Sequence, residues 1–302
     1  MLDDEILENY YQAGKILANA LERGREKVKP GAKLIEITKF IEDKMIRDKG
    51  FSLAFPLNIG IDEITAHYSC PVGDTTIVPE KCLVKLDAGV QLDGYTTDMA
   101  VSVQVGTDEY QSLIAAAEAG LETAIKTIQA GITVGEVGAT VEKVIRGFGV
   151  QPISNLSGHQ MKQFQLHAGI TVPNIKVQDP SNAYRFKAGD IFALEPFATP
   201  ATAAGYVVNG AEEYIHSLLK RKVKNMPSQV VRTINQIWGE RRSLPFSFRW
   251  YSPLPKTTLN RLASLNVIHG YAVLIEASKN PVAQAEKTVL VQEGGCEIIT
   301  KK

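Results

Sequence analysis

The chain repeats one pattern of helices and strands at an interval of about a hundred residues. Residues 6–17 carry apolar side chains three or four positions apart, which predicts an amphipathic helix. Pro30-Gly31 then breaks the chain, and a second helix is predicted from Leu34 to about Gly50. The same order returns over residues 113–149, and the breaks align without a gap at an offset of 100. The repeat predicts two pseudo-symmetric halves, about 1–109 and 110–302.

Strand-like runs follow each predicted pair of helices. In the first half they are Cys82–Asp87 and Thr96–Val105, and Asp93-Gly94 between them is a hairpin-turn signal. In the second half they are Ile191–Glu195 and Ala283–Val291. Two copies of helix–helix–strand–strand predict an α+β fold for one domain, residues 1–302, with a central antiparallel sheet inside and helices outside.

A stretch from Tyr206 to about Leu265 interrupts the second copy. Glu212–Lys224 and Gln229–Arg241 are interpreted as two helices with polar faces, and a loop rich in proline and aromatic residues follows them. We therefore expect a helical insert subdomain over residues 206–265, without a catalytic signature of its own.

Composition excludes several classes of protein. The 33 basic and 33 acidic residues give no net charge, whereas nucleic-acid binders usually carry a basic excess, so direct recognition of nucleic acid is not expected. No apolar run reaches the roughly 18–20 residues that span a bilayer, and the acidic start is unlike a secretory signal. Cys70, Cys82 and Cys296 are widely spaced and odd in number, which predicts plain thiols in the cytoplasm.

Four acidic residues lie in the strand-like runs: Asp87, Asp98, Glu195 and Glu286. A carboxylate is costly to bury unless it is paired or bound to a metal. Asp87 and Asp98 lie on the two arms of the predicted hairpin, and neighbouring strands are about 4.8 Å apart, so both can reach one cation. If such carboxylates bridge two cations, the result is a two-metal hydrolytic site. Each acid alone could cap a turn or face water, so the prediction depends on the set.

Three histidines are candidates for the same chemistry. His159 follows Gly158, whose small size leaves room for the close approach of a ligand, and His167 lies eight residues further on. His67 lies in Ala66-His67-Tyr68, whereas His216 and His269 are interpreted as ordinary core or surface residues. A site rich in oxygen ligands with one imidazole is typical of Mn, Fe or Co. Structural zinc sites prefer Cys and His ligands.

Together these segments resemble the type 2 methionine aminopeptidases of the pita-bread family over almost the whole chain. The order Asp, Asp, His, Glu, Glu, with the aspartates eleven positions apart and the histidines eight positions apart, is highly specific. The insert between Glu195 and Glu286 is typical of type 2, and a short N-terminal segment is typical of the archaeal form. The motifs that carry the resemblance are Phe55-Pro56, Ala66-His67-Tyr68, Leu86–Gly89, Thr97-Asp98, Asn155–His159, His167–Gly169, Leu194–Phe197 and Ala283–Glu286.

The resemblance implies a role for each matching residue. It implies two divalent metal ions, Co, Mn or Fe with Zn as a further candidate, on five ligands: Asp87, Asp98, His159, Glu195 and Glu286. It implies three catalytic residues: His67, His167 and Glu195. It implies a methionine pocket lined, beside the two histidines, by Phe55, Leu166, Phe197 and Tyr271.

The implied activity is removal of the N-terminal methionine from nascent proteins whose second residue is small, by attack of a dimetal-bound hydroxide on the first peptide bond. A cytoplasmic monomer acting on nascent N-termini, with the ribosome as a candidate partner and no membrane, is expected. Two alternatives stay open, an Xaa-Pro peptidase of the same fold and a non-catalytic binding protein on that fold. Ala285 and Lys287 depart from the family's usual Gln-Phe-Glu-His, and Lys287 would change the field at the metals if it points inward.

Overall fold

The computed structural model describes residues 3–46, 50–177, 184–251 and 254–302. Four of its helices come in two pairs: α1 (Asp4–Arg25) with α2 (Leu34–Met45), and α3 (Gln111–Thr127) with α4 (Val134–Gly147). Each pair is joined through a glycine with left-handed backbone, Gly31 at φ 77° and Gly131 at φ 88°. The four predicted helices are therefore confirmed, and the two breaks are alike in conformation as well as in sequence.

The central sheet is antiparallel and has eight strands. It is ordered β1-β3-β4-β13-β8-β6-β7, and β14 pairs with the free length of β13. The first half supplies three strands, and β4 meets β13 of the second half where Ala100 pairs with Glu286. The strands are β1 (Ser52–Ile61), β3 (Cys82–Leu92), β4 (Tyr95–Val105), β6 (Ser157–Met161), β7 (Thr171–Pro173), β8 (Ile191–Leu194), β13 (Glu286–Gln292) and β14 (Gly295–Ile298).

The predicted hairpin is confirmed as β3–β4. Its two-residue loop has positive φ at both positions, 51° at Asp93 and 85° at Gly94. That pair of conformations matches the twist of the flanking strands, which is why Asp-Gly is favoured there. The register then runs without a shift from Leu92 opposite Tyr95 to Cys82 opposite Val105. The loop thus fixes which residues of the two arms share a face.

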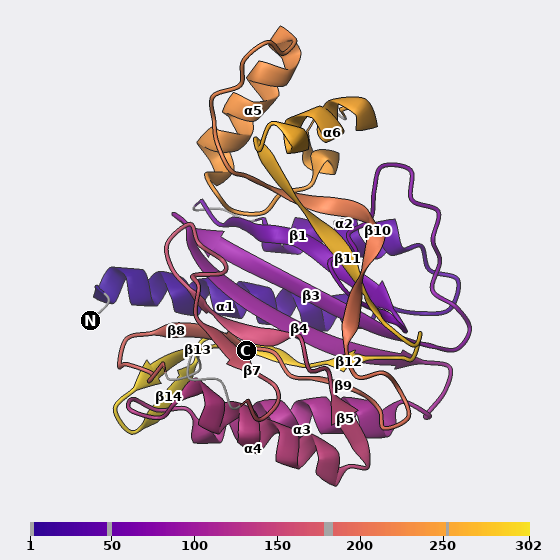
Figure 1. Ribbon diagram of the computed structural model, residues 1–302, viewed down its shortest axis with the longest axis vertical. Helices are drawn as coiled ribbons and strands as arrows, with labels where there is room; N and C mark the ends of the chain where they lie inside the picture. Colours follow the sequence, from indigo (N-terminus) through magenta and orange to yellow (C-terminus); the bar gives the residue numbers. More distant parts are fainter. Residues whose placement is uncertain (1–2, 47–49, 178–183, 252–253) are drawn as a thin grey trace.

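The helices α1, α2, α3 and α4 cover the same face of the central sheet. Leu86 and Ala88 of β3 belong to the core packed against α1 and α2, and Phe192 and Leu194 of β8 belong to the core packed against α3 and α4. Figure 1 shows α3 and α4 beneath the sheet and α1 running along it. Because side chains alternate along a strand, Asp87, which lies between Leu86 and Ala88, points away from the helices.

Two smaller three-stranded sheets complete the fold, and the one built from β5, β9 and β12 packs against α3 and α4. One is ordered β10-β11-β2 and the other β12-β9-β5. Beyond β10 the chain forms α5, a short 3-10 helix and α6, which Figure 1 shows projecting from one end of the molecule. The bounds are β2 (Ile64–Ala66), β5 (Val150–Pro152), β9 (Phe197–Pro200), β10 (Val207–Leu218), α5 (Ser228–Arg241), the 3-10 helix η2 (Phe248–Trp250), α6 (Lys256–Ser264), β11 (Ile268–Glu276) and β12 (Ala283–Gln284).

The prediction of a helix over Glu212–Lys224 is wrong. The chain is extended as far as Leu218 because β10 pairs with β11, from Val207 opposite Glu276 to Leu218 opposite Ile268. This ladder satisfies the backbone groups that a helix would otherwise have paired internally. The helix expected over Gln229–Arg241 is confirmed as α5, and α6 was not predicted.

The insert has its own apolar cluster, in which Ile234, Phe246 and Leu262 are completely buried. Two arginines fix it to the first half. Arg241 donates to the carbonyl oxygens of Leu53, Ala54 (2.7 Å) and Pro245 (2.7 Å). Arg249 donates two hydrogen bonds, of 2.9 and 2.7 Å, to the Glu42 carboxylate on α2. Within the described residues, no helix is long and apolar enough to cross a membrane.

Candidate active site

Three of the predicted ligands lie in one row across the sheet. Asp87 on β3 pairs with Ala100 on β4, and Ala100 pairs in turn with Glu286 on β13. Leu194, the last residue of β8, pairs with Lys287, so Glu195 continues the same row from the next strand. Residues opposite one another in a sheet share a face, and three carboxylates therefore point to one side.

The other two ligands lie in the adjacent row. Asp98 is two residues from Ala100 on β4, and its backbone N–H donates to the Thr288 hydroxyl at 2.7 Å. Thr288 pairs with Ala193 on β8, and Ala193 pairs with His159 on β6. The two rows are one pleat apart, so five side chains from five segments project from the same patch of the helix-free face.

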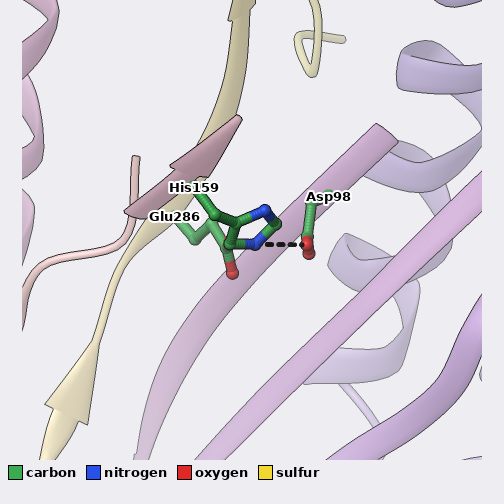
Figure 2. A group of neighbouring side chains, drawn as sticks. All are labelled: Asp98, His159 and Glu286. Atoms are coloured by element: carbon green, nitrogen blue, oxygen red, sulfur yellow. Dashed lines mark ion pairs between the residues drawn. The ribbon is translucent and has the colours of Figure 1, made fainter. Parts of the chain in front are cut away.

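The side chains converge at distances that suit metal coordination. The His159 Nε2 lies 3.4 Å from a carboxylate oxygen of Asp98 and 3.8 Å from one of Glu195. One ligand atom each of Asp98, His159 and Glu286 lie within 4.8 Å of one another, and Figure 2 shows these three side chains gathered from β4, β6 and β13. Glu195 borders the open cavity, with 17% of its side chain exposed, whereas Asp98 and His159 are each 5% exposed.

The electrostatics of this group call for a cation. Burial raises the pKa of Asp98 to about 8, and burial followed by repulsion from neighbouring carboxylates raises the pKa values of Asp87, Glu195 and Glu286 well above their usual range. Burial also lowers the pKa of His159 to about 4, so that this imidazole is neutral and free to coordinate. Four acids with no cationic partner among them would be strongly unfavourable as a purely structural cluster.

Two carboxylate oxygens have no partner of their own. The Oδ1 atoms of Asp87 and Asp98 are buried without a hydrogen bond in the described part of the chain. Unpaired buried oxygens cost free energy unless a ligand occupies them. The donor set, four carboxylates and one imidazole, is one that Mn, Fe or Co accepts. The residues therefore fit the divalent ions that the sequence implies.

Gln284 was not singled out from the sequence. It is buried, and its side-chain amide donates to the Glu286 carboxylate at 3.2 Å. Its backbone is held on both sides by the Ser102 hydroxyl, at 2.8 Å each way. Gln284 thus orients Glu286, one of the five candidate ligands. Its position two residues before Glu286 was the only signal in the sequence.

A cavity of about 330 Å³ opens above the five side chains. The remaining residues that the resemblance implies all line it: Phe55, His67, Leu166, His167, Phe197 and Tyr271. The His167 ring lies 4.4 Å from the His159 ring, and the Tyr271 ring meets the His67 ring edge-on at 5.7 Å. Every candidate residue therefore lies on one continuous site.

His67 is held in an unusual conformation. Its φ is 65°, a left-handed value that costs a non-glycine residue about 1 kcal/mol or more. Its Nδ1 lies 3.1 Å from the Ala272 carbonyl oxygen, which can only accept, so Nδ1 carries the proton and Nε2 is an acceptor. Burial lowers the pKa of His67, which favours this neutral form.

Two expectations about neighbouring residues are resolved by strand alternation. Lys287 points to the helix side of the sheet, where its Nζ donates to the Thr300 carbonyl oxygen at 3.0 Å, so it does not face the metals. Ala285 is buried in the core beside α3 and α4. Gly158 does not make room for a ligand, which corrects the sequence interpretation. A Cβ there would lie 2.4 Å from the Ala193 carbonyl oxygen, so the glycine permits close pairing of β6 with β8.

The fold and the site define a metallopeptidase. Residues 8–242 match the model of metallopeptidase family M24, and the chain belongs to this family. The methionine aminopeptidase of Thermococcus onnurineus is 40% identical over 97% of this chain and 99% of its own. That of Methanocaldococcus jannaschii is 38% identical over 99% of this chain and 100% of its own. Within family M24, the chain belongs to the methionine aminopeptidases.

Solved structures share the fold at low identity. A thermophilic Arx1 matches with a TM-score of 0.83 at 15% identity, over 99% of this chain and 91% of its own. A methionine aminopeptidase from Thermotoga maritima matches with a TM-score of 0.69 at 20% identity, over 100% and 98%. An X-Pro aminopeptidase from the same organism matches with a TM-score of 0.63 at 16% identity, but this chain covers only 62% of it. The predicted pita-bread α+β fold is confirmed.

Proposed function

We propose that this enzyme removes the N-terminal methionine from proteins with a small second residue, using Asp87, Asp98, His159, Glu195 and Glu286 as metal ligands. One observation carries the proposal: four carboxylates and one imidazole lie on one face of the sheet, at the floor of a cavity with apolar walls. The cavity is at the small end of the ligand-site range, which suits one side chain and the adjoining peptide bond. Nascent chains in the cytoplasm, emerging from the ribosome, are the proposed substrates.

When bound, two divalent ions of Mn, Fe, Co or Zn supply Lewis acidity and a water of lowered pKa. The protein's own contribution to the proton transfers centres on Glu195. It is the most exposed of the carboxylates near His159, and it borders the cavity where a substrate carbonyl would lie. A carboxylate at that place accepts the proton of the attacking water and passes it to the leaving amine.

The two cavity histidines act on the peptide unit. The Nε2 of His67 is an acceptor because Nδ1 is bonded to the Ala272 carbonyl, so it receives the N–H of the scissile peptide and positions it. This differs from a role as proton donor, which the lowered pKa of His67 disfavours. His167 donates to the substrate carbonyl oxygen as negative charge develops there, and such a donor contributes roughly 3–4 kcal/mol.

The pocket walls explain the choice of methionine. Phe55, Leu166 and Phe197 are buried apolar residues at the cavity, and Tyr271 closes it with its ring while its hydroxyl contacts Ser217 at 3.3 Å. An unbranched thioether has three rotatable bonds and fills an irregular apolar space well. The preference for a small second residue follows the family.

The test of this function uses Glu195→Gln, which keeps the shape and removes the charge. We expect kcat on Met-Ala-Ser to fall by at least about 10²-fold. Wild-type turnover by a metal-loaded Glu195→Gln would refute the assignment of the base. Comparing the rates of hydrolysis of Met-Ala-Ser and of an Xaa-Pro dipeptide distinguishes the proposed activity from that of an Xaa-Pro peptidase. Metal analysis of the purified wild type separates the non-catalytic binding protein, which would hold no metal.

A further inference from the structure

The neutral total charge of the chain hides a strong segregation of charge. Residues 219–265, which we call the basic segment, hold ten of the 33 basic residues and only one acidic residue, Glu240. The segment therefore carries a net charge of +9, and the remainder of the chain carries −9. The net charge of the whole chain therefore does not describe the charge that each part presents to a partner.

Most of this positive charge faces solvent. Arg241 and Arg249 are used to fix the insert to the first half, as described above. The other eight basic side chains are exposed: Lys220, Arg221, Lys222, Lys224, Arg232, Arg242, Lys256 and Arg261. Lys256 is paired with an acid, lying 3.6 Å from Glu212. Figure 1 shows that α5 and α6, which flank this charge, project beyond the sheet at the end opposite α3 and α4.

Two hydrogen bonds gather the charge at one place. The Arg221 Nε donates to Asn235 on α5 at 2.9 Å, and Arg261 on α6 donates to the Asn225 carbonyl oxygen at 3.1 Å. Asn235 is one turn from Arg232, and residues three apart on a helix are neighbours. We call this group of six the basic corner: Lys220, Arg221, Lys222, Lys224, Arg232 and Arg261.

The loop that carries the lysines is packed. Val223 and Met226 lie against the apolar cluster of the insert, which includes Val230 and Leu262. The backbone that carries Lys222 and Lys224 is therefore anchored by Val223, while their side chains are exposed. A partner that binds here meets an arranged set of cations, which lowers the entropy lost on binding.

We propose that the basic corner binds the phosphate backbone of double-stranded RNA. A polyanion complements a +9 segment and is repelled by the net −9 charge of the remainder, so the enzyme docks with the insert first. The aromatic side chains of residues 219–265 are all buried or half-buried, so in this segment no exposed ring is available for stacking on unpaired bases. Duplex RNA is recognised mainly through its backbone and shape.

A membrane surface fits the same corner less well. The apolar residues Val230, Ile234 and Ile237 of α5 and Leu262 of α6 face inward and are buried. An amphipathic helix needs a free apolar face to enter a bilayer. In the described part of the basic segment, Leu219 and Leu265 are the large apolar residues that are strongly exposed, and they do not form such a face.

The test measures the affinity for an RNA duplex of roughly 20 base pairs by fluorescence anisotropy, between about 50 and 200 mM KCl. Six cations set a limit of about −5 on the slope of log affinity against log salt. The variant Lys220→Gln/Lys222→Gln/Lys224→Gln should flatten the slope by up to about 3 and weaken binding at least tenfold at 100 mM KCl. The control removes the same charge from exposed lysines elsewhere: Lys15→Gln/Lys29→Gln/Lys143→Gln.

The control should bind RNA within about twofold of wild type, because its lysines lie outside the basic corner. Three results would overturn the proposal: no wild-type binding at 50 mM KCl, equal weakening in both triple variants, or lysine-dependent binding to phosphatidylserine vesicles in place of RNA. Hydrolysis of Met-Ala-Ser should be unchanged in both variants. RNA binding and peptide hydrolysis are therefore tested by separate measurements, and failure of one does not imply failure of the other.

Discussion

The position of His159 depends on the absence of a Cβ atom at the preceding residue, Gly158. The variant Gly158→Ala tests this dependence. A Cβ at residue 158 would lie 2.4 Å from the Ala193 carbonyl oxygen and 3.2 Å from the Leu194 Cα. Backbone atoms cannot rotate away as a flexible side chain can. Ordinary contact begins near 3.4 Å, so β6 and β8 must separate locally by about 1 Å.

That separation falls between the candidate ligands. β6 carries His159 and β8 leads into Glu195, and the His159 Nε2 lies only 3.8 Å from Glu195. Misplacement of a catalytic group by about 1 Å can cost about 10²-fold in rate. Overpacking should also lower the free energy of unfolding by about 1–3 kcal/mol. We expect kcat/KM on Met-Ala-Ser to fall about 10²-fold and metal affinity to fall by at least tenfold.

The matched control is Gly147→Ala at the end of α4, where a Cβ would meet nothing within 4 Å. This variant should keep wild-type activity and gain up to about 1 kcal/mol of helix stability. The assays are metal titration by calorimetry, turnover at saturating metal, and thermal unfolding. Wild-type metal affinity and turnover in Gly158→Ala would refute the view that close pairing of β6 with β8 positions His159.

Three further predictions concern the site. His67→Ala should lower kcat at least tenfold with metal content unchanged, whereas loss of metal would make His67 a ligand. Gln284→Ala should weaken metal binding about 10–100-fold by calorimetry, and an unchanged affinity would show that Gln284 does not orient the Glu286 carboxylate. The metal-free protein should lose thermal stability from pH 6.5 to 8. There the native carboxyls with raised pKa values, Asp98 at about 8, still hold protons that the unfolded chain has released. Excess Mn²⁺ should remove this dependence, and a rise in stability would contradict it.

The parts of the fold set by local interactions could be predicted from the sequence. The 3.6-residue periodicity of α1 to α4 is encoded in consecutive residues, and so is the Asp93-Gly94 turn. The free cysteines were also predicted correctly. The prediction of a helix over Glu212–Lys224 was wrong because the charged residues of this region are compatible with a helix. What makes it extended is β11, some fifty residues away, and no local pattern encodes that pairing.

The candidate ligands could be picked out from their strand contexts, but the role of each site residue was accessible only through the resemblance. Spacing alone placed Asp87 and Asp98 on one hairpin, but their meeting with Glu286 depends on the pairing of Ala100 with that residue. A residue such as Gln284, which acts through its neighbours, leaves no signature beyond its proximity to a ligand. The role of Gly158 was misread because the sequence shows that space is needed and not what fills it.

The pairing of β4 with β13 also sets the order of events when the enzyme itself is made. Asp87 and Asp98 are synthesised early, but Glu286 arrives only when nearly three hundred residues have been joined. A partly translated or truncated copy that lacks β13 holds four acidic and imidazole groups without the strand that closes the set. We expect such fragments to lack peptidase activity, so that hydrolysis begins only when the polypeptide is almost whole.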